Sequence, residues 1–176
     1  MNQKEKLFLN KLINKYSKEQ AGKYQLTPDS FSNDDIIQGI NTLLNKKITM
    51  SNITKKFEKE FAKKVGAKYA LMVNSGSSAN LLAFFTLINP MKQNRLKPGD
   101  ECIIPSLCWS TSLWPIVQSG LKPKFVDIDI STLNISIEEL KKKITKKTKA
   151  IMAVHILGNS TNMTELKKII KKKNLY

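Results

Sequence analysis

Cysteine and histidine are scarce in this sequence, which has two cysteines and one histidine among its 176 residues. Cys102 and Cys108 do not have the spacing of the CxxC pattern found in redox and zinc sites. His155, standing alone, cannot complete a His/Cys metal set. We therefore expect two reduced thiols and no structural metal.

Long apolar stretches are also missing. No run approaches the roughly 18 to 20 consecutive apolar residues that a transmembrane helix needs. The first six residues, MNQKEK, lack the apolar segment of a secretory signal peptide. These absences predict a soluble, cytoplasmic protein that does not bind membranes.

Arginine is nearly absent although the chain is strongly basic. The formal net charge is +16 at pH 7, yet Arg95 is the only arginine and lysine supplies the remaining positive charge. Nucleic-acid recognition favours the bidentate guanidinium, and single-strand binding also needs aromatic residues between basic runs. We therefore expect solvent-facing lysines and no nucleic-acid partner. The positive field would still favour an anionic small-molecule substrate.

Residues 1–47 are predicted to form helices joined by an irregular arm. Apolar residues recur at helical spacing over 4–17 and again after Ser32, where acidic residues mark a helix start. The polar stretch 19–32 is either a loosely held segment or an arm that lies across a partner subunit. Beyond residue 47, a third helix is predicted over 51–66, with Ser51 at its start and Gly66 at its end.

From residue 48 onward, the sequence belongs to a second region in which short apolar runs alternate with helical patterns. Strands are predicted at 69–73, 102–105, 124–128 and 150–156, and helices at 77–87, 111–119, 136–144 and 163–172. Pro115 fits the second of these helices only if it lies in the first turn. This alternation predicts an α/β fold with a mainly parallel sheet and helices on both faces. In such sheets ligands bind at the carboxyl ends of the strands.

The turn Asn74-Ser75-Gly76-Ser77-Ser78-Ala79-Asn80 joins the first predicted strand to the helix that follows. A turn of this kind leaves the first helical N–H groups unpaired at the positive end of the helix dipole. Gly76 lets the backbone come close to a ligand, and the serine hydroxyls add donors. The turn therefore predicts a phosphate site. The alternative is that Ser77 or Ser78 only caps the helix.

Three further residues are predicted near the carboxyl edge of the sheet. Trp109 follows the second strand, and its indole could stack on a flat cofactor ring or could cover the sheet end as a core aromatic. His155 lies on an apolar strand, where a hydrogen-bonded core histidine is the commoner role. Cys108 is expected to be a small buried hydrophobe.

Eight short segments occur in an order and spacing typical of one enzyme family. They are FEKEFA (57–62), GAKYA (66–70), NSGSSAN (74–80), KPGDE (97–101), PSLCW (105–109), FVDID (125–129), KKTKAI (146–151) and HILG (155–158). Together they resemble the DegT/DnrJ/EryC1/StrS family of pyridoxal-phosphate-dependent sugar aminotransferases. The resemblance covers residues 48–176. It implies the N-terminal part of a fold-type-I pyridoxal-phosphate-binding α/β domain that is incomplete at its C-terminus.

The resemblance also implies ligands and site residues. The cofactor would be pyridoxal 5′-phosphate (PLP), with its phosphate held by Gly76, Ser77 and Ser78 and its pyridine ring stacked on Trp109. The substrates would be nucleotide-linked 4-keto-6-deoxy sugars used for surface polysaccharide (O-antigen or lipopolysaccharide), with glutamate as the amino donor. The assembly would be a homodimer with its sites at the subunit interface.

Family members continue with an acidic residue that pairs with the pyridine nitrogen and then with a lysine that binds the cofactor covalently. Both positions lie beyond Tyr176, so we assign no catalytic residue and expect the first part of a longer enzyme, inactive alone. An aminotransferase is the leading interpretation. Segment 74–82 and the insert before Leu96 look closer to the family's sugar 3-dehydratases, which have histidine at the lysine position, whereas the loop 108–111 differs from the dehydratase form. A non-catalytic phosphate-binding remnant is a further alternative.

Overall fold

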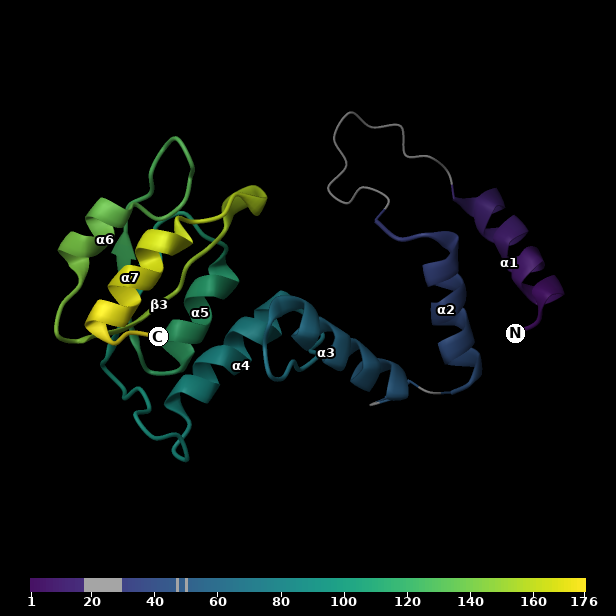
Figure 1. The fold of residues 1–176 in the computed structure, drawn as a ribbon, viewed down its shortest axis with the longest axis horizontal. Helices are drawn as coiled ribbons and strands as arrows, with labels where there is room; N and C mark the ends of the chain where they lie inside the picture. Colours follow the sequence, from purple (N-terminus) through teal and green to yellow (C-terminus); the bar gives the residue numbers. More distant parts are fainter. Residues whose placement is uncertain (18–29, 47, 50) are drawn as a thin grey trace. The chain divides into compact units, whose positions relative to one another are not determined.

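A computed structural model describes residues 1–17, 30–46, 48–49 and 51–176 (Figure 1). The chain forms two units, Met1–Met72 and Val73–Tyr176, each compact in itself. Most of the expected arm at 19–32 lies outside the described residues. The expected domain boundary at residue 47 stays a prediction.

The described part of the first unit contains the helices α1 (Gln3–Tyr16), α2 (Asn33–Leu44) and α3 (Asn52–Val65). The predicted helix starts and the predicted stop are confirmed. The Ser32 and Ser51 side chains cap α2 and α3, and Gly66 ends α3 with φ 69°, a left-handed conformation that suits a residue without Cβ. Asn33 Nδ2 donates a hydrogen bond of 2.7 Å to Asn14 Oδ1, which ties α2 to α1.

The second unit is built on a parallel sheet, as the sequence predicts. Strand β1 (Glu101–Pro105) lies between β2 (Lys122–Val126) and β3 (Thr148–Ile151), and both neighbours run parallel to it. Strands that follow one another in the chain are joined through a helix, α5 (Ser110–Gln118) between β1 and β2 and α6 (Ile137–Lys143) between β2 and β3. The sheet therefore consists of consecutive strand–helix–strand units.

Helices cover both faces of this sheet (Figure 1). Cys102 and Ile104 of β1 point into one core, with residues of α4 (Gly76–Ile88) and α5. Ile103, between them, points into the other core, with α6 and α7 (Met163–Lys173). All three β1 side chains are fully buried, so this strand is apolar on both faces because each face meets a helical layer.

The predicted strand at 69–73 is wrong. The described residues include no strand that pairs with this run, and Tyr69 and Leu71 are exposed. The Met72 N–H instead donates to the Glu58 side chain, with N···Oε1 2.9 Å. A short apolar run becomes a strand only where a neighbouring strand takes up its backbone groups, which the run itself cannot specify.

Two other predicted strands have different bounds in the structure. The strand expected at 124–128 begins at Lys122, because Pro123 is tolerated in β2, which lies at the edge of the three-stranded sheet. The strand expected at 150–156 ends at Ile151, and a short 3₁₀ helix, Ile156–Gly158, follows. The expectation that this whole run is buried on both faces is therefore wrong: residues 151–154 are half-buried and His155 is exposed.

None of the helices in the described part of the chain has the length and apolar composition needed to cross a lipid bilayer. Cys102 and Cys108 are free thiols. Burial raises the pKa of the Cys102 thiol to about 12, so this residue behaves as a core hydrophobe.

Candidate functional site

Helix α4 begins at the Gly/Ser turn, with Ser75 as its N-cap. Ser75 Oγ accepts a hydrogen bond from the Ser78 backbone N–H at 3.1 Å and donates one to Ser78 Oγ at 3.2 Å. The alternative that Ser77 or Ser78 caps the helix is therefore wrong. Among the described residues, no protein acceptor pairs with the N–H groups of Gly76 and Ser77. Two backbone donors at the positive helix end thus remain free for a ligand.

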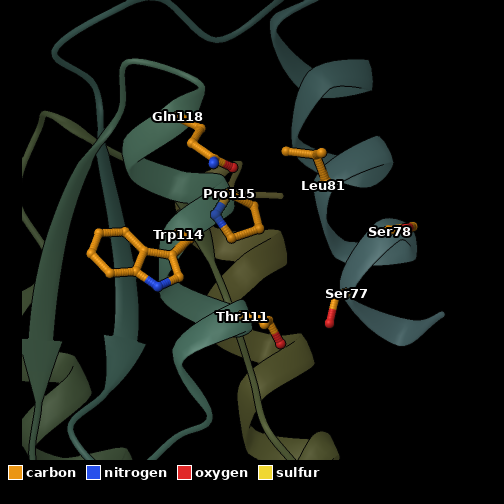
Figure 2. A pocket seen from close by; sticks show the side chains of 7 residues that line it. All are labelled: Ser77, Ser78, Leu81, Thr111, Trp114, Pro115 and Gln118. Atoms are coloured by element: carbon orange, nitrogen blue, oxygen red, sulfur yellow. The ribbon is translucent and has the colours of Figure 1, made fainter.

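A cavity of about 250 Å³ lies between α4 and α5. In Figure 2 the Ser77 and Thr111 hydroxyls lie at one end of it, the Gln118 amide and Leu81 lie at the other, and Pro115 lies between the two ends. Its volume is below the roughly 300–1,000 Å³ of a typical small-molecule pocket. The cavity would therefore hold part of a larger ligand, with a polar group at the hydroxyl end.

The two helices begin at the same end of this cavity. Ser77 and Thr111 lie in the first turns of α4 and α5, and Asn80 Nδ2 of α4 donates to the Thr111 carbonyl at 3.3 Å. The positive ends of both helix dipoles therefore point toward the same region, which favours an anion there.

Trp109 is the N-cap residue of α5, and its side chain is 75% exposed. The alternative that it is a core aromatic is therefore wrong. The tryptophan among the residues lining the cavity is Trp114, whose ring points away from α4 in Figure 2. The stacking of Trp109 on a cofactor ring stays a prediction.

Sequence reasoning did not predict a site role for the cavity-lining residues Leu81, Thr111, Trp114, Pro115 and Gln118. A signal for some of them exists, since Leu81 follows Ser77 by four residues and Pro115 follows Thr111 by four. Residues four apart share one helix face. Which face of α5 meets which face of α4 could not be predicted, because the two helices are packed together only in the folded chain.

Pro115 lies in the middle of α5, so the expectation of a first-turn proline is also wrong. Helix α5 starts at Ser110, earlier than the predicted helix. The proline has no N–H to donate to the carbonyl of Thr111, four residues earlier. The Asn80 side chain takes that place.

The segment after β3 lies at the carboxyl end of the strand, as expected. The side chain of Asn134 holds its backbone in place. His155 Nδ1 accepts from the Thr161 N–H at 3.1 Å, so a neutral His155 carries its proton on Nε2. Asn134 Nδ2 donates to the Asn159 carbonyl at 3.1 Å, and its Oδ1 accepts from the Ile156 N–H at 3.2 Å. His155 is exposed, so the interpretation as a core histidine is wrong.

Cys108 is half-buried and packs against the core beneath α4 and α5. Burial raises the pKa of its thiol, so little of it is ionised at neutral pH. It is a packing residue, as predicted, although less deeply buried than Cys102.

The sequence matches a model of the DegT/DnrJ/EryC1/StrS aminotransferase family over residues 31–176. Over 139 residues it is 51% identical to the GDP-4-keto-6-deoxy-D-mannose 3-dehydratase of Escherichia coli O55:H7 (strain CB9615 / EPEC), an alignment covering 78% of this chain and 36% of that protein. Over 125 residues it is 37% identical to the GDP-perosamine synthase of Escherichia coli O157:H7, covering 71% of this chain and 32% of that protein. The chain thus spans about a third of the length of these relatives.

A solved structure agrees with this family match. The E. coli GDP-4-keto-6-deoxy-D-mannose-3-dehydratase with bound hydrated PLP matches with a TM-score of 0.79 and 47% identity, covering 87% of this chain and 39% of that chain. Further structures of this dehydratase hold a trapped PLP-glutamate geminal diamine or, in a mutant, GDP-perosamine. These likenesses confirm the predicted fold class, and they agree with the PLP dependence expected of the family.

Proposed function

Because this chain belongs to the DegT/DnrJ/EryC1/StrS aminotransferase family, we propose that it is the N-terminal part of a PLP-dependent sugar 3-dehydratase. Its substrate would be a GDP-linked 4-keto-6-deoxy sugar destined for surface polysaccharide. The observation that carries this proposal is the 51% identity to a 3-dehydratase, against 37% to a perosamine synthase. The dehydratase therefore moves ahead of the aminotransferase, which the sequence alone placed first.

The start of α4 fits the phosphate of PLP. The free N–H groups of Gly76 and Ser77 would bind its oxygens, and the hydroxyls of Ser77 and Ser78 would donate further hydrogen bonds. A Cβ added at Gly76 would meet no protein atom within 4 Å, so the space beside this backbone is open to a ligand. Ser75 would keep the turn in shape through its bond to the Ser78 N–H.

The exposed Trp109 and the positive net charge of the chain would also contribute to the proposed activity. When bound, PLP supplies an electron sink for bond cleavage beside an amine. Trp109, being exposed at the start of α5, would cover one face of the cofactor ring and exclude water from it. The net charge of +16 would draw in both the cofactor and the nucleotide sugar, which are anions.

The aminotransferase remains the second candidate because of the identity to GDP-perosamine synthase. The two reactions differ in where the glutamate nitrogen goes. A transaminase leaves it on the sugar, whereas a 3-dehydratase returns a nitrogen-free sugar, so the nitrogen must leave as ammonium.

Incubating the full-length enzyme that contains this chain with PLP, glutamate and a GDP-linked 4-keto-6-deoxy sugar separates the two. We expect 2-oxoglutarate, ammonium and a sugar that has lost its C3 hydroxyl, identified by mass spectrometry. An amino sugar without ammonium would replace the dehydratase by the aminotransferase. Binding of PLP without either product would favour the non-catalytic remnant.

The phosphate assignment has its own test in the Ser77→Ala variant. Loss of a hydroxyl that donates to a charged phosphate is expected to weaken PLP binding roughly 10- to 150-fold, since such hydrogen bonds contribute roughly 1.5–3 kcal/mol and each 1.4 kcal/mol is a factor of ten. Thr86→Ala is the matched control, because Thr86 lies near the other end of α4 and its hydroxyl donates to the Leu82 carbonyl. Equal PLP affinity in the two variants would remove Ser77 from the site.

We further propose that the protein works as a homodimer, with glutamate and the nucleotide sugar as its small-molecule partners. This assembly follows from the family resemblance. Sedimentation of the full-length enzyme at micromolar concentration measures it directly, and a monomer with full activity would contradict it.

A further inference from the structure

Helix α5 contains a proline in its interior, and this creates a defect in its hydrogen bonding. Pro115 is buried and lies five residues after the first residue of the helix, Ser110. In a regular helix the N–H of residue 115 would donate to the Thr111 carbonyl. Since proline has no N–H, that carbonyl loses its ordinary donor.

A side chain from a different helix supplies the missing donor. Asn80 is half-buried in α4, and its Nδ2 donates to the Thr111 carbonyl at 3.3 Å. Asn80 lies one turn after Ser77, and Thr111 lies in the first turn of α5. The bond therefore joins the second turn of α4 to the first turn of α5, directly beside the cavity that Ser77 and Thr111 line.

We propose that Asn80 is a positioning residue for the cofactor site. By bonding to the carbonyl that Pro115 leaves free, it holds the free N–H groups of Gly76 and Ser77 in register with the start of α5, which carries Trp109. The proposal rests on the proposed function only for the identity of the ligand. The connection between the two helices is a property of this chain by itself.

A positioning role has to be separated from the simpler role of giving the partly buried Thr111 carbonyl a hydrogen-bond donor. The double variant Asn80→Ala/Pro115→Ala makes that separation. Alanine at position 115 restores the N–H that pairs with the Thr111 carbonyl, so it repairs the helix. It does not restore the connection between α4 and α5.

A double-mutant cycle compares four proteins: the wild type, Asn80→Ala, Pro115→Ala and the double variant. Unfolding in urea and the affinity for PLP are measured on each. We expect Asn80→Ala to lower the unfolding midpoint and to weaken PLP binding about fivefold, as for loss of one neutral hydrogen bond. In the Pro115→Ala background, Asn80→Ala should leave the midpoint nearly unchanged and should still weaken PLP binding about fivefold.

Two results would overturn the positioning role. One is PLP affinity that does not change in Asn80→Ala. The other is affinity that recovers in the double variant together with stability, which would make Asn80 a purely structural residue.

A failure of the proposed function can be recognised separately. If the wild type binds no PLP, amide hydrogen exchange in the first turn of α4 becomes the measurement. Faster exchange at Ser78 and Ala79, whose N–H groups donate to Ser75, in both Asn80→Ala and the double variant would support positioning of this turn. Unchanged exchange would refute it.

Discussion

Replacing Asn134 with alanine is expected to release the loop that carries His155. Asn134 is only 3% exposed, and its side chain holds the Asn159 carbonyl at 3.1 Å and the Ile156 N–H at 3.2 Å. A third contact, from Thr161 Oγ1, is 3.5 Å long, and this hydroxyl also donates to the Val154 carbonyl at 3.1 Å. The loss of stability in Asn134→Ala is therefore set by the two hydrogen bonds to Asn159 and Ile156.

The size of the effect follows from these two bonds. Each contributes about 1 kcal/mol net, and a backbone group left unpaired in a partly buried place adds a desolvation cost. We expect the free energy of unfolding to fall by about 2–3 kcal/mol. For a domain of this size, that corresponds to a Tm lower by roughly 10 °C.

Urea unfolding followed by circular dichroism measures the global change, and hydrogen exchange at the Ile156 amide measures the local one. The matched control is Asn89→Ala, because the Asn89 side chain accepts a single bond, 2.9 Å long, from the Met91 N–H at the surface. The control should change stability by less than about 1 kcal/mol. Equal losses in the two variants, or unchanged exchange at Ile156, would refute the assignment of Asn134 as the anchor of this loop.

Two further predictions test the fold and its pH dependence. Leu140→Ala, at a fully buried side chain of α6, should cost about 3 kcal/mol in urea unfolding, whereas Leu157→Ala, at a leucine 93% exposed, should cost less than about 0.5 kcal/mol; similar losses would contradict the two-layer core. Hydrogen bonds from Thr145, Thr148 and Lys124 hold the pKa of Glu101 below its usual value, the bond from Thr145 being the largest cause. Because the folded-state pKa is lowered, the ionised carboxylate stabilises the fold above the ordinary carboxyl range, and this contribution is lost as pH falls through the lowered pKa. The stability gap between wild type and Glu101→Gln should therefore shrink on acidification, and a gap independent of pH would show that the charge of Glu101 contributes nothing.

Features set by neighbours in the chain could be predicted from the sequence. Ser32, Ser51 and Gly66 mark helix ends because a cap depends on the residue itself and on backbone groups within one turn. The parallel sheet could also be predicted, because apolar strands alternating with helices have few other ways to bury both faces. The turn at 74–80 was correctly placed at the start of a helix for the same local reason.

Features that depend on distant residues could not be predicted. The run 69–73 has every local property of a strand, yet no described strand pairs with it. Nothing in the sequence around Trp109 indicates that it is exposed while Trp114, five residues later, lines the cavity. Pro115 was expected near a helix start because its missing N–H is harmless there, and the partner that makes it tolerable in mid-helix lies 35 residues earlier, at Asn80.

The sequence by itself determined the capped ends of α2 and α3, the alternation of strands and helices that forms a parallel sheet, and the family resemblance that suggests PLP. Only the tertiary structure decided which N–H groups stay free at the start of α4, which faces of α4 and α5 enclose a cavity, and which side chain repairs the helix at Pro115. The physical reason is the range of the interactions. Caps and periodicity act within a few residues, whereas strand pairing, cavity shape and the bond from Asn80 to Thr111 exist only after segments far apart in the chain have packed together.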